Sequence, residues 1–375
     1  MQFNFLPLEI VLLVISVISL LIQFWFTLGI HRSLLFFKSS DKLNRDLKPL
    51  SVVIAARNEA ENLKQFLPKI FEQDYPNFEV VVVNDRSWDG TADLLKEFSL
   101  LYPNLKIVTI AEGEKFIAGK KFAVSMGIKA AKNEWLVFTD ADCEPSSDQW
   151  LKEMSTPEDE NVEILLGYSP YFKSFGLLNA LIRYETFFTA VNYLSFALKG
   201  NPYMGVGRNL AYKKSLFFKG KGFAAHMHIS SGDDDLFVNA NANSINTGIC
   251  IDKDAQVWSV PKDSWSTYLK QKKRHGSAGK LYKAKHKWIL SVQVIFQVIF
   301  YASLLFLVFL PNGLYFAIGI WLFSTLIRAF VYPTLLSRLN YPELRWWFPF
   351  LDVLLYVFLM FNGVVSIFVK KSSWK

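Results

Sequence analysis

Two kinds of apolar pattern divide the chain. Apolar runs long enough to cross a bilayer extend from Leu6 to Ile30 and then over Trp288–Leu310, Gly313–Leu336 and Trp347–Val369. Between them, short Val- and Ile-rich runs alternate with amphipathic helical patterns. This alternation is typical of an α/β domain with a parallel sheet that is covered on both faces. We therefore expect four membrane spans and one α/β domain.

The α/β part begins with repeated strand and helix patterns. Strands are expected at Leu50–Ala56, Phe78–Asp85, Leu105–Ile110 and Glu134–Thr139, with helices at Glu59–Glu72, from Gly90 onward and at Lys120–Ala131. The pattern is looser after Asp142. There we expect a strand within Val162–Tyr171, a helix at Phe175–Leu198, a second helix that follows Asp233–Asp235 and ends near Ser244, and two short strands within Ile245–Val260.

Composition supports a membrane protein. Of the 375 residues, 51% are hydrophobic, including 34 Phe and 11 Trp, which is more than an ordinary soluble chain carries. The net charge of +8 comes from Lys and Arg beside the apolar runs and not from one recognisable reading helix. Membrane lipids, and no nucleic acid, are therefore the expected partners. The two cysteines, Cys143 and Cys250, have no metal-ligand spacing and fit a reducing compartment.

Charge beside the first apolar run predicts its orientation. No Lys or Arg precedes it, and His31-Arg32 follow it, so we expect an uncleaved anchor whose amino end lies outside. The expected boundaries are an anchor at 1–32, a linker at 33–49, the α/β domain at 50–261, a basic amphipathic interface segment at 262–287, membrane helices at 288–370 and a tail at 371–375. This arrangement predicts an inner or plasma membrane protein with a cytoplasmic catalytic domain.

Two charged residues fall inside the predicted spans. Arg328 and Asp352 lie in the third and fourth apolar runs. A charge in that environment is costly unless it is paired. The sequence therefore predicts an ion pair between Arg328 and Asp352.

Polar side chains follow three of the predicted strands: Arg57-Asn58-Glu59, Asn84-Asp85 and Asp140-Ala141-Asp142. Ligands of open α/β sheets bind beyond the carboxyl ends of the strands, so these groups are expected at one edge. Asp140 and Asp142 are two apart in extended chain and point the same way. Their carboxylate oxygens suit Mg²⁺ or Mn²⁺.

Helix capping is a simpler explanation for some of these residues. It accounts for Asn58 or Asp85 one at a time, and for the Asp233–Asp235 triplet at the start of a helical pattern. It explains Asp140 together with Asp142 less well, because neighbouring carboxylates repel each other unless a cation lies between them.

The chain from about Ser51 to Lys280 resembles glycosyltransferase family 2, the inverting enzymes of the GT-A fold. It is most similar to the membrane-bound branch related to cellulose, chitin and hyaluronan synthases. The resemblance lies in the order and spacing of VVIAARNEAENL (Val52–Leu63), VVVNDRSWDGT (Val81–Thr91), the lysine-to-DxD stretch (Gly119–Asp142), SGDDDLF (Ser231–Phe237) and QKKRH (Gln271–His275). It implies a Rossmann-like mixed sheet with helices on both faces.

The resemblance also implies roles on the donor side of a site. Arg57 and Glu59 fall in the family's first nucleotide loop, and Asp85 would hold the base or ribose. Lys120 and Asp140 would contact the nucleotide sugar. Asp142, together with Asp140, would hold Mg²⁺ or Mn²⁺.

The catalytic base implied by the resemblance is Asp233, with Asp234 as the alternative because Gly232 replaces the acidic residue that usually precedes the catalytic Asp. Gln271 and Arg274 match the family's QxxRW motif and would bind the donor. His275 replaces the Trp of that motif, which belongs to the acceptor site of polymer-making relatives.

These expectations combine into an enzyme. It would be a metal-dependent inverting glycosyltransferase that moves a sugar from a nucleoside diphosphate sugar, by default a UDP-sugar, to a hydroxyl of a lipid, lipid-linked or glycan acceptor. A processive polysaccharide synthase, a nucleotidyltransferase and a non-catalytic nucleotide-sugar-binding scaffold are the alternatives. Four spans are few for a polysaccharide channel made by one chain, which favours a lipid or lipid-linked acceptor.

Overall fold

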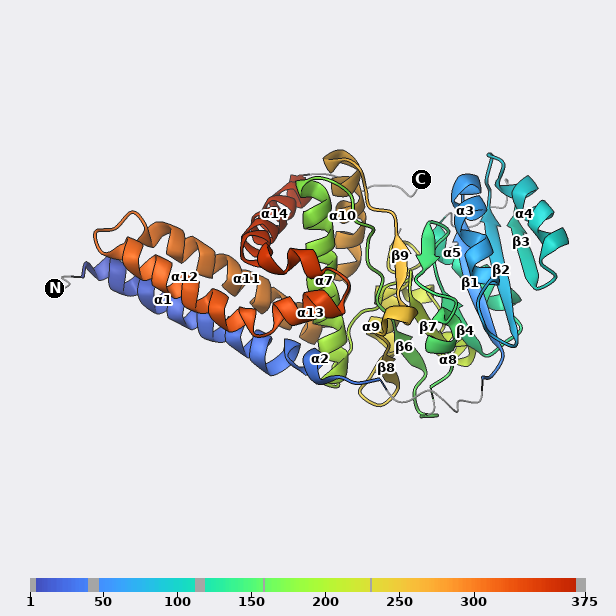
Figure 1. Cartoon of the computed structure of the whole chain (residues 1–375), viewed down its shortest axis with the longest axis horizontal. Coiled ribbons are helices and arrows are strands. Elements are labelled where there is room, and N and C mark those ends of the chain that lie inside the picture. The colour runs from blue at the N-terminus through green and yellow to red at the C-terminus, as the bar shows by residue number, and fades with distance from the viewer. Residues whose placement is uncertain (1–4, 40–46, 112–118, 158, 230, 369–375) are drawn as a thin grey trace. The chain divides into compact units, whose positions relative to one another are not determined.

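The computed structural model describes residues 5–39, 47–111, 119–157, 159–229 and 231–368. They form two compact units, whose elements are labelled in Figure 1. The helical unit comprises the described residues of Met1–Phe37, Phe175–Ser195 and Lys283–Lys370, and the sheet unit comprises those of Lys38–Ser174 and Phe196–Tyr282. Residues 40–46 of the expected linker (33–49) and the expected tail (371–375) lie outside the described residues.

A seven-stranded mixed sheet forms the centre of the sheet unit. Its strands are β1 (Leu50–Ala56), β2 (Phe78–Asp85), β3 (Leu105–Ile110), β4 (Trp135–Phe138), β6 (Ile164–Leu166), β7 (Leu210–Lys213) and β8 (Thr247–Ile249). Their order is β3-β2-β1-β4-β7-β6-β8. The first three strands match the predicted bounds residue for residue, because uninterrupted Val and Ile runs between polar turns leave little ambiguity.

The sheet is parallel only in part. Strands β1 to β4 are parallel neighbours, β7 pairs antiparallel with both β4 and β6, and β6 pairs parallel with β8. A second sheet joins β5 (Cys143–Pro145) to β9 (Val257–Ser259). Strand β7, within a Gly-rich stretch, was not predicted because it has only four residues. The mixed sheet implied by the family resemblance is confirmed, whereas an all-parallel sheet is wrong beyond β4.

Helices cover both faces of the sheet, as predicted. Val52 and Ile54 belong to the core shared with α3 (Ala60–Phe71), while the alternate residues Val53 and Ala55 face α5 (Lys120–Ala130). Gly127 allows the close approach of α5, since a Cβ there would lie 2.6 Å from a methyl group of Val53. This packing fixes the amino end of α5, where Lys120 lies, near the ends of the strands.

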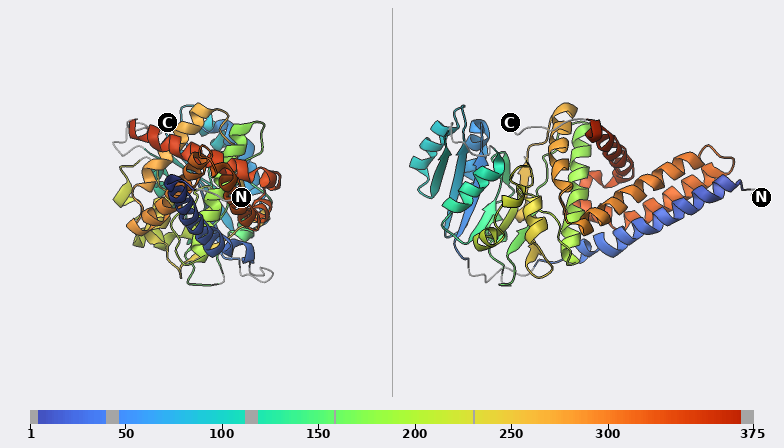
Figure 2. Two further views of the ribbon diagram at one scale, coloured as in Figure 1. Left: turned by 90° about the vertical axis from the view of Figure 1, so that its left-hand side faces the viewer. Right: turned by 180° about the vertical axis from the view of Figure 1, so that it is seen from behind.

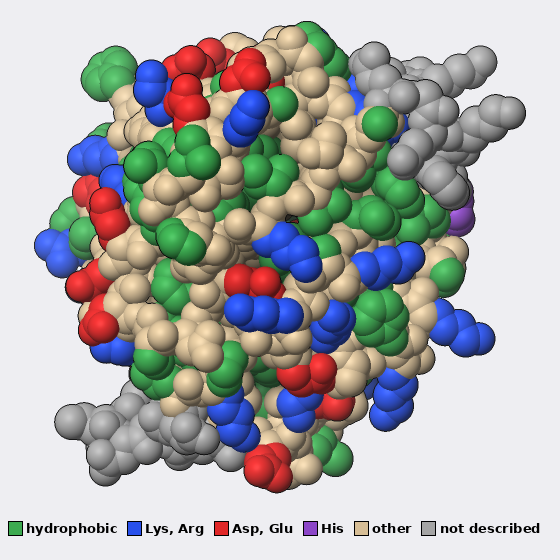
Figure 3. All heavy atoms as spheres, turned by 90° about the vertical axis from the view of Figure 1, so that its right-hand side faces the viewer, with side chains coloured by type: hydrophobic (Ala, Val, Ile, Leu, Met, Phe, Trp, Pro, Cys, Tyr) green, Lys and Arg blue, Asp and Glu red, His purple; other side chains and the backbone are tan. Residues whose placement is uncertain are grey.

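Shorter helices complete the sheet unit: α4 (Thr91–Leu101), α6 (Trp150–Glu153), α8 (Lys214–Lys219), η2 (Ala224–His226), α9 (Asp235–Asn241), η3 (Lys253–Ala255) and α10 (Trp265–Gly279). The basic segment predicted to extend to Lys287 is interrupted, because α10 ends at Gly279 and the next helix begins at Ala284. On the face of the sheet unit in Figure 3, Lys and Arg side chains are interspersed with Asp and Glu.

The helical unit contains the apolar elements. They are α1 (Pro7–Phe24), the π-helical η1 (Trp25–His31), α2 (Ser33–Phe36), α7 (Leu177–Leu198, to Ser195 in this unit), α11 (Ala284–Leu307), α12 (Gly313–Ala329), α13 (Tyr332–Arg338), η4 (Pro342–Trp346) and α14 (Phe348–Phe368). Helices α1, α11 and α12 lie side by side in both views of Figure 2 and contact one another.

In the described part of the chain, fewer helices than the four expected are long and apolar enough to span a membrane. Within the described residues, Pro7–Phe36 and Ala284–Leu307 pass by length and composition. Gly313–Ala329 and Tyr332–Arg338 form a third span only if the pair, bent by 40°, counts as one. The last apolar helix is shorter over its described part, Phe348–Gly363. These helices, near the start and in the last quarter of the sequence, are consistent with a membrane-associated protein.

The predicted ion pair of the apolar helices is present. The Nη1 atom of Arg328 in α12 lies 2.5 Å from Oδ2 of Asp352 in α14, and both side chains are almost fully buried. Ser324 accepts a further hydrogen bond from Arg328 at 2.7 Å, while the hydroxyl groups of Tyr184 and Tyr301 donate to Asp352. The buried charges are therefore both paired and hydrogen-bonded, which an apolar environment requires.

This network gives the first prediction. Asp352→Leu leaves the Arg328 guanidinium buried without its counter-charge, so it should lower the free energy of unfolding by about 3–5 kcal/mol. The double variant Arg328→Met/Asp352→Leu removes both charges and should recover most of that loss. Thermal unfolding of the purified full chain in detergent measures both, with the exposed Leu322→Ala as control. A double variant no more stable than Asp352→Leu would contradict this role for the pair.

Candidate active site

Three strand ends bring their polar residues to one edge of the sheet. Strands β2, β1 and β4 are adjacent and parallel, and their carboxyl ends point the same way. Asp85 is the last residue of β2, while Arg57 and Asp140 follow β1 and β4. The loops after β1 and β2 are joined directly: the Trp88 backbone N–H donates to the Asn58 side chain at 3.0 Å. The predicted convergence of these strand ends is therefore present in the sheet unit.

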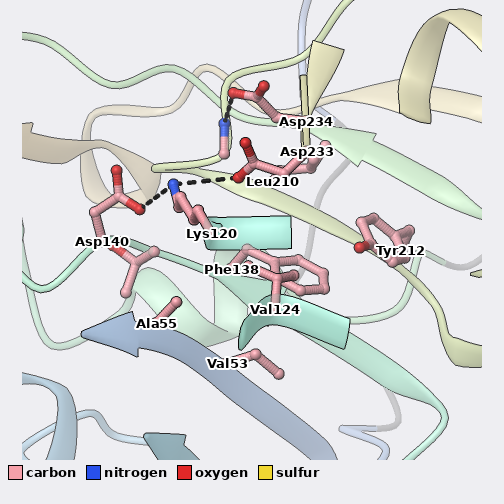
Figure 4. Close-up of a pocket in the computed structure, with 12 residues that line it drawn as sticks. Val53, Ala55, Lys120, Val124, Phe138, Asp140, Leu210, Tyr212, Asp233 and Asp234 are labelled. Carbon is pink, nitrogen blue, oxygen red and sulfur yellow. Dashed lines mark hydrogen bonds and ion pairs between the residues drawn. The ribbon is translucent and has the colours of Figure 1, made fainter. Parts of the chain in front are cut away.

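Lys120 connects two distant acidic segments. Its Nζ atom lies 2.7 Å from Oδ1 of Asp140, after β4, and 3.2 Å from Oδ2 of Asp233, before α9 (Figure 4). These three residues line a pocket together with Asp234, Gly207 and apolar side chains of β1, β4 and β7. About a quarter of the Lys120 side chain and of the Asp140 side chain is exposed, so both remain accessible from the pocket.

The three consecutive aspartates point to different partners. Asp233 pairs with Lys120. The Asp234 carboxylate accepts the backbone N–H groups of Gly207 and Asp235, each at 2.7 Å, and so caps α9. Asp235 accepts a hydrogen bond from the Tyr282 hydroxyl at 2.8 Å and from a backbone N–H at the start of α9. Capping, the simpler explanation for the triplet, is therefore right for Asp234, while Asp233 faces the pocket cation.

Charge and burial shift the pKa values of these groups in opposite directions. Burial alone would lower the pKa of Lys120, but the carboxylates of Asp140, Asp233 and Asp234 raise it above its usual value. Burial would raise the pKa of Asp140, but Lys120, Arg208 and Arg274 hold it below the usual range. Lys120 and Asp140 are thus stabilised as an ionised pair at neutral pH.

Two carboxyl groups of the triplet have raised pKa values. Burial, and then the neighbouring Asp233, raise the pKa of Asp234. Burial and the Asp234 charge raise the pKa of Asp235 to about 7, despite the opposing hydrogen bond from Tyr282. Lys121 lies beside the triplet, where burial lowers its pKa to about 8, and its ammonium group donates to the His226 carbonyl oxygen at 2.6 Å.

The expected nucleotide residues lie along the β1 and β2 ends. Asp85 is fully buried, and one of its carboxylate oxygens pairs with Arg86 at 2.6 Å. Its other oxygen, Oδ2, has no hydrogen-bond partner among the described residues. The Arg57 guanidinium lies over the Trp88 ring at 5.3 Å, and Glu59 accepts a hydrogen bond from Asn62. Asp85 thus offers a buried acceptor at the same sheet edge as Asp140.

Gln271 and Arg274 lie on α10, within the sheet unit. The Gln271 side chain donates to the Tyr171 hydroxyl at 3.4 Å. The Arg274 backbone carbonyl accepts from Ser231, two residues before Asp233, and the Arg274 charge stabilises ionised Asp140. Arg274 therefore lies near the acidic residues, while Gln271 contacts Tyr171.

Sequence reasoning missed Arg208, which follows a Gly-rich stretch that matches no dinucleotide fingerprint. Its guanidinium lies 4.2 Å from the centre of the Tyr171 ring and contributes to the low pKa of Asp140. The only signal in the sequence was a basic residue that follows two glycines and precedes a short apolar run, in GVGRNLAY. The apolar run forms strand β7, and its antiparallel pairing with β4 could not be predicted from the sequence.

Asp140 and Asp142 have the donor set expected of a divalent-cation site. Both are partly exposed carboxylates at the carboxyl end of β4, and Asp142 also accepts a weak hydrogen bond from the Cys143 thiol at 3.5 Å. Mg²⁺ in phosphate-transfer sites uses one or two carboxylates plus substrate phosphates and water, so two acids suffice. Among the described residues, a separate group of possible ligands consists of Glu153, Cys250 and Asp252.

The model of Glycosyl transferase family 2 matches residues 51–218. Glycosyltransferase AglE of Haloferax volcanii is 36% identical over 121 residues, which are 32% of this chain and 38% of that protein. The poly-beta-1,6-N-acetyl-D-glucosamine synthase of Staphylococcus epidermidis is 30% identical over 99 residues, covering 26% of this chain and 23% of the synthase. The chain thus spans less than two-fifths of the length of these relatives.

The fold resembles that of a solved glycosyltransferase. The mannosyltransferase PcManGT from Pyrobaculum calidifontis, solved in complex with GDP-Man and Mn²⁺, superimposes with a TM-score of 0.58 at 19% identity. The match covers 88% of this chain and 99% of that one. The predicted GT-A arrangement of strands and helices is therefore confirmed. Residues 51–218 of this chain match the model of Glycosyl transferase family 2.

Proposed function

We propose that the protein is a membrane-bound, metal-dependent inverting glycosyltransferase that moves a sugar from a nucleoside diphosphate sugar to an acceptor hydroxyl. The observation that carries the proposal is the ion-paired group of Lys120, Asp140 and Asp233 at the carboxyl edge of a family 2 domain. This group combines a fixed cation for a leaving phosphate with a carboxylate for an acceptor proton, which are the two functions that the transfer requires.

The nucleotide is proposed to lie along the ends of β1 and β2. The buried Oδ2 of Asp85 supports binding of the base or ribose there, because a buried acceptor gains most from a donor on the ligand. Arg57 and Glu59 border the same edge. We propose a uridine nucleotide, and the GDP-Man of the structural neighbour makes a guanosine nucleotide the alternative to test.

The diphosphate is proposed to lie near Asp140 and Asp142, which would hold Mg²⁺ or Mn²⁺. When bound, the cation supplies positive charge that stabilises the leaving diphosphate. The Lys120 ammonium group adds a further charge, kept protonated by its acidic neighbours. Gln271 and Arg274 on α10 complete the set of residues that we assign to donor binding.

We assign the catalytic base to Asp233. Asp233 and Asp234 both line the pocket, but the two carboxylate oxygens of Asp234 accept backbone N–H groups, whereas the Asp233 carboxylate pairs with the Lys120 ammonium group. Asp235 accepts a hydrogen bond from Tyr282. Asp233 would accept the proton of the acceptor hydroxyl while that oxygen bonds to the anomeric carbon. The bond from the anomeric carbon to the diphosphate breaks in the same displacement, so configuration inverts.

The acceptor is proposed to be a lipid, a lipid-linked sugar or a glycan at the membrane. Two apolar helices long enough to span a bilayer support it, together with the basic α10 just before Ala284–Leu307. Lys and Arg beside these helices favour a catalytic domain on the cytoplasmic side of an inner or plasma membrane. The synthase among the relatives keeps processive polymer synthesis as a second candidate.

Metal dependence is tested by release of nucleoside diphosphate from UDP- and GDP-sugars by the purified full chain. Release should stop with a chelator and return with Mn²⁺ or Mg²⁺. Asp142→Asn should lower the rate by about 10²-fold or more, because the leaving diphosphate loses part of its charge stabilisation. The matched control is Asp148→Asn, a carboxylate outside the pocket. Chelator-resistant release at an unchanged rate in Asp142→Asn would refute the metal site.

The base assignment is tested by Asp233→Asn and Asp234→Asn. Loss of a general base should lower kcat of Asp233→Asn by about 10²–10⁴-fold while binding of the donor persists. Asp234→Asn keeps one acceptor for the Gly207 N–H and should retain more activity. Calorimetric binding of the sugar nucleotide separates the two effects. Tight donor binding with no turnover by the unmodified protein would favour a non-catalytic scaffold, and equal kcat in Asp233→Asn would exclude Asp233 as base.

A further inference from the structure

Arg208 is held at the pocket edge by the strands on both sides of it. It lies two residues before β7, as Asp140 lies two residues after β4, and Phe138 of β4 pairs with Leu210 of β7. Gly207 donates its N–H to Asp234. On the other side, the buried Asn209 side chain donates to the carbonyl groups of Tyr168 and Ala255 at 2.8 and 2.7 Å. The backbone of Arg208 is thus fixed beside the DxD acids.

The Arg208 guanidinium group is also held in place, but only some of its N–H donors have hydrogen-bond acceptors among the described residues. One face lies 4.2 Å from the Tyr171 ring, a cation–π contact, and Nη2 donates weakly to the Ser169 carbonyl oxygen at 3.4 Å. Nη1 is buried and has no hydrogen-bond partner among the described residues. A buried charged donor without an acceptor is costly, so its position favours a ligand that brings an oxygen to it.

The charges around Arg208 indicate what kind of ligand this is. Burial would lower the pKa of Arg208, but Tyr171, Cys143, Asp142 and Asp140 keep it above the usual value, so the group is always a cation. Neither Asp140 nor Asp142 forms an ion pair with Arg208 among the described contacts, although both act on its charge. An oxyanion placed at Asp140 and Asp142 by a cation would therefore meet a pre-oriented guanidinium.

We propose that Arg208 binds a phosphate oxygen of the nucleoside diphosphate, with Tyr171 as the positioning residue that holds its guanidinium. This inference rests on the proposed function. It adds a third basic side chain, after Lys120 and Arg274, to the residues proposed to bind the leaving diphosphate. Tyr171 also accepts the hydrogen bond from Gln271, so the same ring connects Arg208 to the QxxR helix α10.

The test compares binding of UDP and UMP, and of GDP and GMP, to the full chain in detergent with Mn²⁺, by calorimetry. Arg208→Gln should weaken binding of the diphosphate by about tenfold or more, the usual size of a lost hydrogen bond to a charged group. Binding of the monophosphate should change far less. Arg208→Lys keeps the charge but loses the planar fork and should fall between the two.

Two controls separate this effect from general changes in charge or fold. Lys219→Gln removes one exposed positive charge from α8 and should leave the preference for diphosphate over monophosphate unchanged. Unfolding temperatures show whether each variant folds, and Arg208→Lys carries the test if Arg208→Gln does not fold, with a reduced diphosphate preference still expected.

Substitution of Tyr171 tests the positioning role. Tyr171→Phe keeps the ring beneath the guanidinium and should retain most of the diphosphate preference, whereas Tyr171→Leu removes the ring and should reduce that preference. A loss of stability alone would not change the ratio of diphosphate to monophosphate affinity. Equal reduction of the ratio in Phe and Leu variants would contradict the ring contact.

The outcomes distinguish this inference from the function on which it rests. If the unmodified protein binds diphosphate and Arg208→Gln binds it equally well, the role of Arg208 is refuted and the proposed function stands. If the unmodified protein binds neither UDP nor GDP and releases neither from a sugar nucleotide, both are refuted.

Discussion

The site depends on a single ammonium group shared between two carboxylates. Lys120 lies between Asp140, which follows a central parallel strand, and Asp233, which comes more than ninety residues later in the chain. Like charges so close together repel, and the lysine offsets that repulsion. Sheet and helix packing set its position, because Gly127 lets α5 approach β1 and β2 closely. Any displacement of α5 would therefore separate the donor-side and base-side acids.

The same charges explain how the proposed roles are divided within the acidic triplet. Neighbouring residues at the start of a helix point in different directions, so each aspartate meets a different partner. The cap role of Asp234 fixes the loop that carries Gly207 and Arg208. The hydrogen bond from Tyr282 to Asp235 anchors the segment that follows α10. Asp233 is left facing the pocket, held by Lys120.

Sequence alone predicted the elements with strong local patterns. Strands β1, β2 and β3 match their predicted bounds because their apolar runs are continuous and end at polar turns. Pairing between Arg328 and Asp352 was also predictable, since an apolar environment leaves a buried charge few other partners. Both conclusions come from a local pattern or from a simple energetic requirement.

What the sequence did not predict depends on contacts between distant segments. Strand β7 has four residues and is specified by pairing with β4, so the stretch before it reads as a loop and Arg208 was not noticed. The break between α10 and α11 falls in a basic segment whose helical pattern continues across it. Within the described residues, two helices, or three if the bent pair α12 and α13 counts as one span, are long and apolar enough to cross a membrane, because the described part of the last apolar helix, Phe348–Gly363, is shorter.

An experimental structure of the full chain with Mn²⁺ and a nucleoside diphosphate tests the proposed site most directly, because anomalous scattering locates the metal independently of the protein. We expect the manganese signal at Asp140 and Asp142, with the diphosphate within reach of Lys120. A signal at Glu153, Cys250 and Asp252 instead, with the diphosphate away from Lys120, would contradict the site proposed for this protein.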